Sequence, residues 1–440
     1  MSRRRYKTFR GGIHPPYNKE LSSGMAIEEA PCPPEVIIPL QQHIGAPNQP
    51  VVSPGDRVEP GTLVARTQAY VSAPVHSSVA GTVTEIREIE GPAGATVSAV
   101  IIATDPVQPA FSAVQRDVSG LLPGEIREVA RDAGLVGMGG AAFPTQVKLS
   151  PPEGKQVDLV LINACECEPF LTCDHRLLLE KPGEVVAGLE LFMRAAGSTQ
   201  GVIGIEANKM DALKGLEEEA SSREGISVEV LEVKYPQGAE KQLICAATGR
   251  KVPPGKLPVE TGCLVQNVGT AVAMYQAAAT GMPLYQRVVT VTGQGVVRPC
   301  NLLVRIGTPI SVLVEAAGGF SEEPGKVIMG GPMTGWAQKD LGCPVVKGTS
   351  GVLVFPRRMV DTLEERTCVR CSHCIDACPM HLMPSFIVDA VQQEDWERAE
   401  LWGASDCFEC GTCSYTCPSG IPHVSYVREA KARIAAIKRG

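Results

Sequence analysis

The sequence predicts a multidomain α/β protein built from four units of different architecture. From Val36 to about Ala103, short β-like runs alternate with Gly and Pro turns. From about Pro123 to Met282, helical periods alternate with apolar strands, and eight cysteines cluster in the last quarter of the 440 residues. We therefore expect a β domain, an α/β domain, a small β module and a helical, cysteine-rich unit, in that order.

Composition excludes several classes of function. The net charge is -7, aromatic residues make up 5%, and no basic run is interleaved with them, so we expect no nucleic-acid partner. No apolar run reaches the length of a membrane-spanning helix, and no apolar stretch follows the basic start "MSRRRYKTF". The sixteen cysteines are therefore expected in a reducing compartment, as metal ligands or small buried side chains.

The first 110 residues divide into an arm, 1–30, and a β domain, 31–110. The arm, "FRGGIHPPYNKELSSG", is rich in turn-forming residues. The stretches "VVSPGDRVEPGTLVA" and "VSAPVHSSVAGTVTEI" resemble the barrel-sandwich fold of biotinyl and lipoyl carriers. Those carriers modify a lysine at a hairpin tip, whereas this chain has "APVHSSVAG" there. We expect the scaffold without the swinging cofactor, and His76 at the surface.

The α/β domain, 111–285, contains the first candidate ligand site. In "GLVGMGGAAFPTQVKL", Gly137, Gly139 and Gly140 allow backbone N–H groups to approach an anion, and Lys148 offers a countercharge.

A second polar stretch follows the apolar strand "QVDLVLINA". In "NACECEPF", Asn163, Glu166 and Glu168 come at the carboxyl end of this strand, which is where open α/β sheets bind ligands.

A compact β unit, 286–345, precedes the cysteines. The run "RVVTVTG" alternates and "GTPISVLVEAAGG" reads as a short helix, a combination that resembles a β-grasp module of the soluble-ligand-binding (SLBB) kind. Residues 346–365, which include "GVLVF", are expected to form a linker to the cysteine-rich unit, 366–440.

The motifs "CVRCSHCIDACP" and "CFECGTCSYTCP" share the bacterial ferredoxin spacing. Structural zinc or a thiol relay is the alternative, but zinc ribbons need two separated pairs. In the ferredoxin pattern the fourth cysteine of each motif serves the other cluster. We therefore expect two [4Fe–4S] clusters, with the ligands Cys368, Cys371, Cys374 and Cys417 for the first and Cys407, Cys410, Cys413 and Cys378 for the second.

Two helices are expected around these motifs. Ile387, Ala390 and Val391 recur at helical spacing between the clusters. The tail "SYVREAKARIAAIKRG" has an apolar stripe flanked by basic residues. It either touches a membrane surface or a membrane partner, or it packs on the ferredoxin unit.

The glycine-rich stretch and "NACECEPF" together resemble the flavin-binding signature of the NADH-oxidising subunit of respiratory complex I. "YPQGAE" and "QNVGT" match two further motifs of that family in the same order. The resemblance implies that Glu168, Glu240 and Lys241 face the dinucleotide. It implies FMN contacts from Gly137, Gly139, Gly140, Lys148, Asn163, Glu166, Tyr235, Gly238, Asn267 and Thr270. The chain departs from that family at Met138, Cys165 and Ala239.

The order of units, with "FRGGIHPP" near the start, resembles the RnfC family of the Rnf complex, a membrane-bound, ion-translocating ferredoxin:NAD+ oxidoreductase. This implies non-covalent FMN, NAD(H) as substrate, and hydride transfer to FMN without a catalytic side chain. It implies the other Rnf subunits (A, B, D, E and G) as partners, with the ferredoxin-like RnfB among them and ferredoxin reached indirectly. A peripheral position on the cytoplasmic face of the cell membrane follows. The alternatives are a cobalamin reductase of the propanediol-utilisation type, whose flavin motif tends to open the chain, and a non-enzymatic electron-transfer scaffold with an empty flavin pocket.

Overall fold

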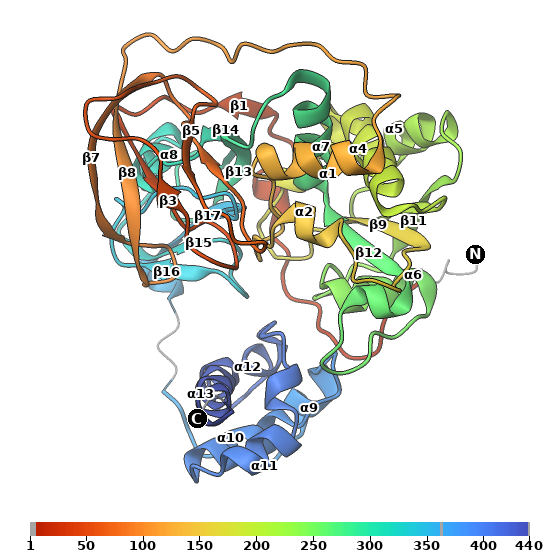
Figure 1. Cartoon of the computed structure of the whole chain (residues 1–440). Helices are drawn as coiled ribbons and strands as arrows, with labels where there is room; N and C mark the ends of the chain where they lie inside the picture. Colours follow the sequence, from red (N-terminus) through yellow and green to blue (C-terminus); the bar gives the residue numbers. More distant parts are fainter. Residues whose placement is uncertain (1–5, 361–363, 439–440) are drawn as a thin grey trace.

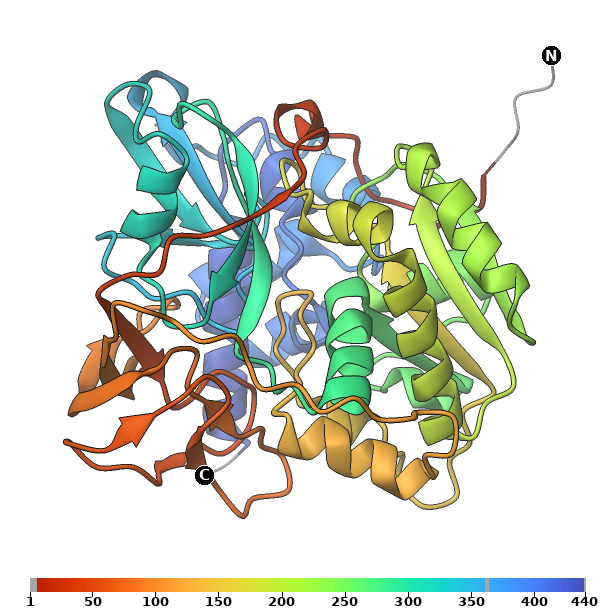
Figure 2. The same ribbon diagram turned by 90° about the horizontal axis from the view of Figure 1, so that it is seen from above.

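The computed structural model describes residues 6–360 and 364–438, and it contains the four expected units. Figure 1 shows the first three units joined in one body, with the cysteine-rich unit below it. The view from above in Figure 2 shows the two β units side by side and the α/β domain next to them. The N-terminal arm runs between the α/β domain and the cysteine-rich unit in Figure 1.

The barrel-sandwich domain consists of two small antiparallel sheets, with the strand orders β2-β8-β7-β4 and β3-β5-β6. The strands are β2 (Glu35–Pro39), β3 (Gln49–Pro50), β4 (Arg57–Val58), β5 (Leu63–Arg66), β6 (Val75–His76), β7 (Gly81–Glu90) and β8 (Thr96–Thr104). Alternating side chains of β2 and β8, Val36, Ile38, Val100 and Ile102, are fully buried between the sheets. This alternation places one face of each strand in the core and leaves the other face outside it.

The prediction that His76 lies at the surface is wrong, because its side chain is buried. The hairpin that contains it docks against the rest of the body. The ammonium group of Lys347 donates to Pro74 O at 2.6 Å and to Gly134 O at 2.7 Å, and so joins the hairpin to the α/β domain. A hairpin fastened in this way cannot swing as a carrier does.

The α/β domain has a four-stranded parallel sheet with the order β11-β10-β9-β12. Its elements are α1 (Pro123–Asp132), α2 (Thr145–Lys148), β9 (Leu159–Ala164), α3 (Cys173–Glu180), α4 (Pro182–Ala196), β10 (Gly201–Glu206), α5 (Met210–Ser221), β11 (Ile226–Leu231), α6 (Glu240–Thr248), η2 (Pro258–Thr261), β12 (Cys263–Asn267) and α7 (Val268–Thr280). α4 and α7 pack on one face and α6 on the other, which is the expected Rossmann-like arrangement. Because the strands after β9 run to one side and β12 joins on the other, the strand order reverses between β9 and β12.

The small β module is larger than predicted, because it recruits strands from outside 286–345. Its sheet has the order β1-β14-β13-β17-β15-β16. The elements are η1 (Lys19–Leu21) and β1 (Ile27–Glu29) from the arm, then β13 (Gln286–Thr292), β14 (Cys300–Arg305), α8 (Ile310–Ala316), β15 (Pro324–Met329), β16 (Trp336–Gln338), β17 (Gly351–Pro356) and η3 (Arg357–Met359).

The prediction of a linker over 346–365 is wrong for residues 351–356. They form β17, which pairs with β13 on one side and β15 on the other. The run "GVLVF" is apolar because this central strand is buried on both faces. The rest of the predicted linker includes residues 361–363, which lie outside the described residues.

The cysteine-rich unit is helical, as expected. Its elements are α9 (His373–Ala377), α10 (Pro384–Gln392), α11 (Trp396–Leu401), η4 (Ala404–Asp406), α12 (Thr412–Tyr415) and α13 (His423–Ile437). The stripe on α13 is buried against α10 and α11 at Val427, Ala430 and Ile434, while Ile437 remains exposed. Of the two alternatives for this helix, packing on its own unit is therefore the one the structure supports. Within the described ranges, no helix is both long and apolar enough to cross a membrane.

Candidate functional site

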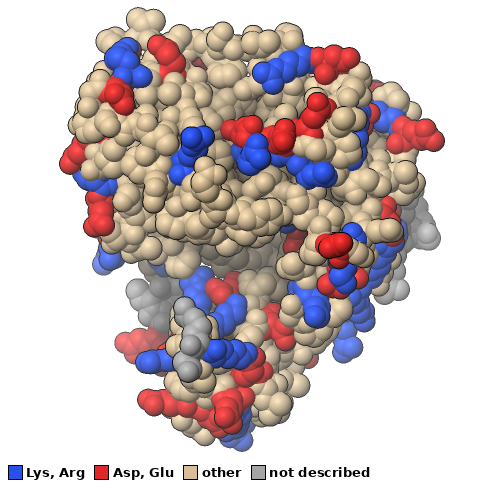
Figure 3. Space-filling view, in the orientation of Figure 1, with Lys and Arg blue, Asp and Glu red and all other residues tan. Residues whose placement is uncertain are grey.

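One cavity of about 1380 Å³ lies where all four units meet. Figure 3 shows the molecule hollowed between its upper body and the cysteine-rich unit. The cavity extends from the glycine-rich loop to Phe408 and Cys410 of the second cysteine motif. Its lining includes the predicted residues Gly137, Gly139, Gly140, Lys148, Asn163, Glu166, Glu168, Tyr235, Gly238, Glu240, Lys241 and Asn267.

The sheet edge under this cavity is the point where the strand order reverses. Asn163 of β9 and Asn267 of β12 are direct neighbours in register at the carboxyl ends of their strands. Asn163 Nδ2 donates to Gly238 O at 2.7 Å, and Asn267 Oδ1 accepts from Gly269 N at 2.8 Å as the N-cap of α7. Parallel sheets bind nucleotide-like ligands in the crevice at this switch point.

The glycine-rich loop leaves room for a ligand. A Cβ atom at Gly140 would meet nothing within 4 Å, and one at Gly139 would meet only Asn267, at 3.6 Å. Nearby, Gln266 lines the cavity, and its Nε2 is buried without a hydrogen-bond partner in the described part of the chain. A buried amide donor without a partner next to open backbone fits a polar cofactor such as a flavin.

Thr270 supports this loop from behind and does not line the cavity. Its Oγ1 accepts from Met138 N at 2.9 Å and donates to Val136 O at 3.2 Å. On the other side, the buried guanidinium of Arg287 donates to Met138 O at 3.3 Å and to Lys347 O at 2.5 Å. Met138, which departs from the complex I pattern, is thus held through its backbone, and Arg287 is a contributor that the sequence did not reveal.

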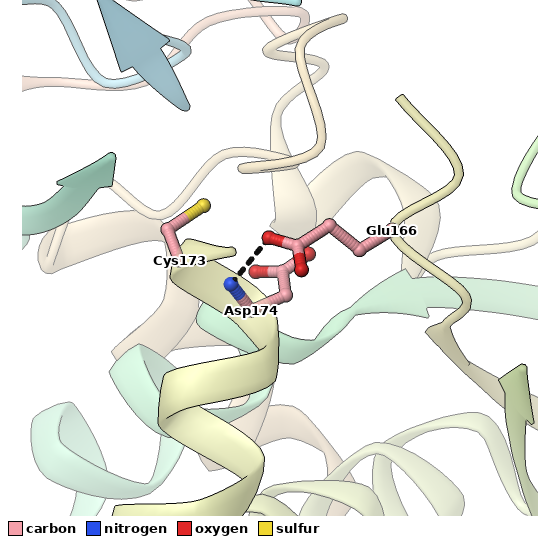
Figure 4. A group of neighbouring side chains, drawn as sticks. All are labelled: Glu166, Cys173 and Asp174. Carbon is pink, nitrogen blue, oxygen red and sulfur yellow. Dashed lines mark hydrogen bonds between the residues drawn. The ribbon is translucent and has the colours of Figure 1, made fainter. Parts of the chain in front are cut away.

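An acidic group lies beside the loop, at the start of α3 (Figure 4). Glu166, Cys173 and Asp174 each bring one possible ligand atom within 4.8 Å of the others. The carboxylate of Glu166 accepts from Asp174 N at 2.7 Å and His175 N at 3.2 Å, and Asn267 Nδ2 donates to Asp174 Oδ2 at 2.6 Å. Both carboxylates therefore have structural partners, and Glu166 caps α3 from the strand-end loop.

Asp174 makes the stability of the site depend on pH. Burial, and after it the charge of Glu166, raises the pKa of Asp174 to about 7. An unfolded aspartate titrates near about pH 4, so the folded protein holds a proton that the unfolded chain has lost, and stability falls as pH rises from about 4 to about 7. We expect Asp174→Asn to gain unfolding temperature relative to the wild type as pH rises from about 5 to about 7, and then to hold a constant difference. A difference that is the same at every pH would contradict this, and the exposed Asp389→Asn is the control.

The other acidic residues of the cavity are also engaged. Glu168 accepts from Met333 N at 3.1 Å and Thr334 Oγ1 at 2.5 Å, so it ties the strand-end loop to the turn between β15 and β16. Lys148 Nζ donates to Glu240 Oε1 at 2.6 Å and to Val265 O at 2.9 Å. The predicted flavin lysine and the predicted dinucleotide carboxylate thus form an ion pair at the cavity wall.

Lys19 is a second residue that the sequence did not reveal. It comes from the arm, is buried, and donates to the carbonyl oxygens of Glu166, Glu168 and Leu171 at 2.7, 3.0 and 2.6 Å. Burial lowers the pKa of this lysine despite the nearby carboxylate of Glu166. Lys19 holds the loop that presents both predicted carboxylates. The stretch "YNKELSSG" contains no local signal for this, because its partners lie |i−j| = 147 or more residues away.

The cysteines gather across the two motifs as the ferredoxin pattern implies. Burial raises the pKa of Cys413, and the thiols of Cys410, Cys407 and Cys378 raise it further. Cys378, the last cysteine of the first motif, therefore lies with the first three of the second. In the first motif, Cys374 interacts with Cys368.

Three hydrogen bonds join the cysteine-rich unit to the cavity wall and the arm. Tyr235 Oη donates to Cys410 O at 2.7 Å, and Gln242 Nε2 donates to Pro379 O at 3.0 Å. From the arm, Gly12 N donates to Ala377 O at 2.9 Å. Tyr235, predicted as a flavin contact, lines the cavity and also contacts a predicted cluster ligand.

Four segments of the chain match known families in the order of the units. Residues 7–106 match the RnfC barrel sandwich hybrid domain, and residues 130–276 match the Nuo51 FMN-binding domain. Residues 288–337 match the SLBB domain, and residues 361–418 match a 4Fe-4S dicluster domain.

Whole-length relatives decide the family. The RnfC-type protein of the proton-translocating ferredoxin:NAD(+) oxidoreductase complex of Clostridium ljungdahlii is 44% identical over 398 residues, which are 90% of this chain and 86% of that protein. Its counterpart in the Na(+)-translocating ferredoxin:NAD(+) oxidoreductase complex of Acetobacterium woodii is 43% identical over 437 residues, 99% of each chain. The chain belongs to the RnfC family. It therefore has an FMN-binding domain and a domain for two [4Fe–4S] clusters.

A solved structure supports the fold. A chain of an NAD+-reducing [NiFe]-hydrogenase in the air-oxidised state superposes with a TM-score of 0.50 at 22% identity. The superposition covers 70% of this chain and 61% of that one.

Proposed function

We propose that this chain is the NAD(H)-reacting component of an ion-translocating ferredoxin:NAD+ oxidoreductase complex. The observation that carries this proposal is the continuous cavity that connects the switch point of the parallel sheet with Cys410 of the second cysteine motif. A flavin at one end and a cluster at the other would thereby share one space.

In this cavity the flavin rests on the glycine-rich loop and the sheet edge. The loop backbone at Gly139 and Gly140, together with Asn163, Asn267 and Lys148, would hold FMN, as the open space over the glycines supports. FMN supplies the chemistry that exchanges a hydride with nicotinamide and single electrons with iron–sulfur clusters. The protein binds and orients the two ring systems and excludes water, and no side chain needs to act as nucleophile or base.

The dinucleotide occupies the outer part of the cavity, where Glu168, Glu240 and Lys241 lie. The cluster of Cys407, Cys410, Cys413 and Cys378 is the nearer acceptor, because Phe408 and Cys410 line the cavity. The cluster of Cys368, Cys371, Cys374 and Cys417 is the farther one, and its exposed Cys368 and Cys371 offer the exit toward a partner.

The partners in this proposal are the other Rnf subunits (A, B, D, E and G), with the ferredoxin-like RnfB linking the chain to ferredoxin. The chain then sits on the cytoplasmic face of the cell membrane as a peripheral component. The family membership supports this assignment.

Glu168→Gln tests the dinucleotide end of the proposal. Glutamine keeps an acceptor for Met333 N and Thr334 Oγ1 but loses the charge, so charge-assisted hydrogen bonds to the dinucleotide weaken. We expect NADH-driven flavin reduction, followed by stopped-flow absorbance, to slow about tenfold, with unchanged iron and FMN content. Wild-type flavin reduction in this variant would refute the role of Glu168. Glu322→Gln, in a surface ion pair with Arg358, is the matched control.

A further inference from the structure

The barrel-sandwich domain forms part of the cavity, opposite the sheet edge. Six of its residues line it, and we call them the barrel wall: Gln41, Gln42, Ile44, Tyr70, Pro92 and Ala93. None of the six carries a charge. The flavin residues line another part of the same cavity.

Two side chains of the barrel wall are exposed although they are large and apolar. Ile44 is 55% and Tyr70 is 62% exposed, whereas the core of the same domain is fully buried. Large apolar side chains exposed inside a cavity, rather than scattered on a convex surface, are typical of ligand contact. An aromatic ring at such a position offers a stacking face for a planar ligand.

The barrel wall is fastened to the glycine-rich loop and is therefore a preformed surface. Ile44 N donates to Ala142 O at 3.3 Å, and Gln146 Nε2 donates to Tyr70 O at 3.0 Å.

The two barrel loops that carry Ile44 and Tyr70 are also joined to each other. Ala46 N donates to Val71 O at 3.2 Å, and Asn48 Nδ2 donates to both Leu40 O and Ala73 O, at 3.0 and 2.9 Å. At another edge of the wall, the side-chain amide of Gln338 in β16 donates to Pro92 O at 2.9 Å. The wall thus has a fixed position relative to the flavin loop.

We infer that the barrel wall, through Tyr70 and Ile44, is the binding surface for the adenine base of the dinucleotide. This inference rests on the proposed function. A dinucleotide whose nicotinamide lies against the flavin must extend its adenosine half away from the sheet edge. The cavity is also larger than the several hundred Å³ that one small ligand needs, which leaves room for this half beside the flavin.

The chemistry of the wall fits an uncharged planar base. Because the wall lacks Lys and Arg, it offers no partner to a 2′-phosphate, so the site favours NADH over NADPH. The side-chain amide of Gln42 is already used, since its Nε2 donates to Pro39 O and its Oε1 accepts from Lys347 N. Stacking on Tyr70 and apolar contact with Ile44 therefore dominate the recognition.

The test uses Tyr70→Ala in the FMN- and cluster-loaded protein, with two hydride donors. NADH carries the adenosine half, and reduced nicotinamide mononucleotide lacks it. We expect the KM for NADH to rise about tenfold, with kcat unchanged, because losing a base–aromatic stack weakens binding by about that factor. The KM for the mononucleotide should stay at the wild-type value.

Matched variants separate stacking from damage to the fold. Tyr70→Phe keeps the ring and should behave as the wild type, and Ile44→Ala should raise the KM for NADH in the same direction. Tyr415→Ala, an exposed tyrosine that is not part of the cavity lining, should change neither donor.

An unchanged KM for NADH in both Tyr70→Ala and Ile44→Ala would overturn the inference and leave the proposed function standing. Equal losses for both donors would also overturn it, because the adenosine half would then not be what Tyr70 recognises. If neither donor reduces the flavin of the wild type, the proposed function itself fails, and the inference fails with it.

Discussion

Replacement of Cys378 by serine is expected to remove the cluster next to the cavity, although Cys378 belongs to the first cysteine motif. After burial, the thiol of Cys378 is among the groups that raise the pKa of Cys407, Cys410 and Cys413, which requires all four to be close together. A serine oxygen is a poor replacement for a thiolate ligand of iron. About half of the iron and acid-labile sulfide should be lost if the remaining cluster survives.

The functional consequence of Cys378→Ser follows from the position of this cluster. NADH should still reduce the flavin at the wild-type rate, because the flavin residues are untouched. Electrons should then fail to reach the remaining cluster, because the lost cluster stands between the two. EPR of the NADH-reduced protein, read beside stopped-flow flavin absorbance, measures both effects.

Cys417→Ser is the matched control, because it is the mirror-image change in the second motif. It should remove the exposed cluster of Cys368, Cys371 and Cys374 and leave NADH-dependent reduction of the cavity-side cluster intact. If Cys378→Ser instead eliminated the cluster of Cys368, each motif would bind its own four-cysteine cluster, and the crossed assignment would be wrong.

Lys19→Met is expected to cause the second-largest effect, on flavin binding and stability together. Methionine keeps most of the side-chain volume but removes the donor to three carbonyl oxygens at 2.7, 3.0 and 2.6 Å. Each buried acceptor left without a partner costs about 1–3 kcal/mol, and the loop can relax to limit the sum. We expect a net loss of about 3 kcal/mol in the free energy of unfolding.

The same change should weaken FMN binding, because the freed loop carries Glu166, which caps α3, and Glu168, which holds Met333 and Thr334. Titration of the apo-flavoprotein with FMN should give a Kd at least about tenfold higher than that of the wild type. Lys7→Met is the control, because Lys7 forms an exposed ion pair with Glu229, and such pairs contribute little. Equal behaviour of Lys19→Met and Lys7→Met would show that the loop does not depend on the arm.

Much of the architecture could be predicted from local patterns. The helix between the two cysteine motifs follows from the spacing of Ile387, Ala390 and Val391, and the order of units follows from the texture of each segment. The strand β17 was missed, because a short apolar run fits a buried strand and a short connection equally well. His76 was misjudged, because burial on another domain leaves no trace in a short hairpin sequence.

Site residues divide in the same way. All the residues that the complex I resemblance implied for flavin and dinucleotide line the large cavity except Thr270, which lies behind it. Lys19, Arg287 and Lys347 were not predicted. Each is a buried cation that donates to backbone carbonyl groups, and a carbonyl looks the same in every residue.

By itself, the sequence determined the chemistry of the clusters, because ligands two or three residues apart are gathered by the local backbone alone. It also determined the flavin loop, because Gly137, Gly139 and Gly140 act within one turn. Only the tertiary structure decided which cluster faces the flavin site, which arm residue holds the strand-end loop, and that the barrel closes the cavity. Those outcomes depend on contacts between segments tens to hundreds of residues apart, whose free energy comes from packing and hydrogen bonds that no short stretch encodes.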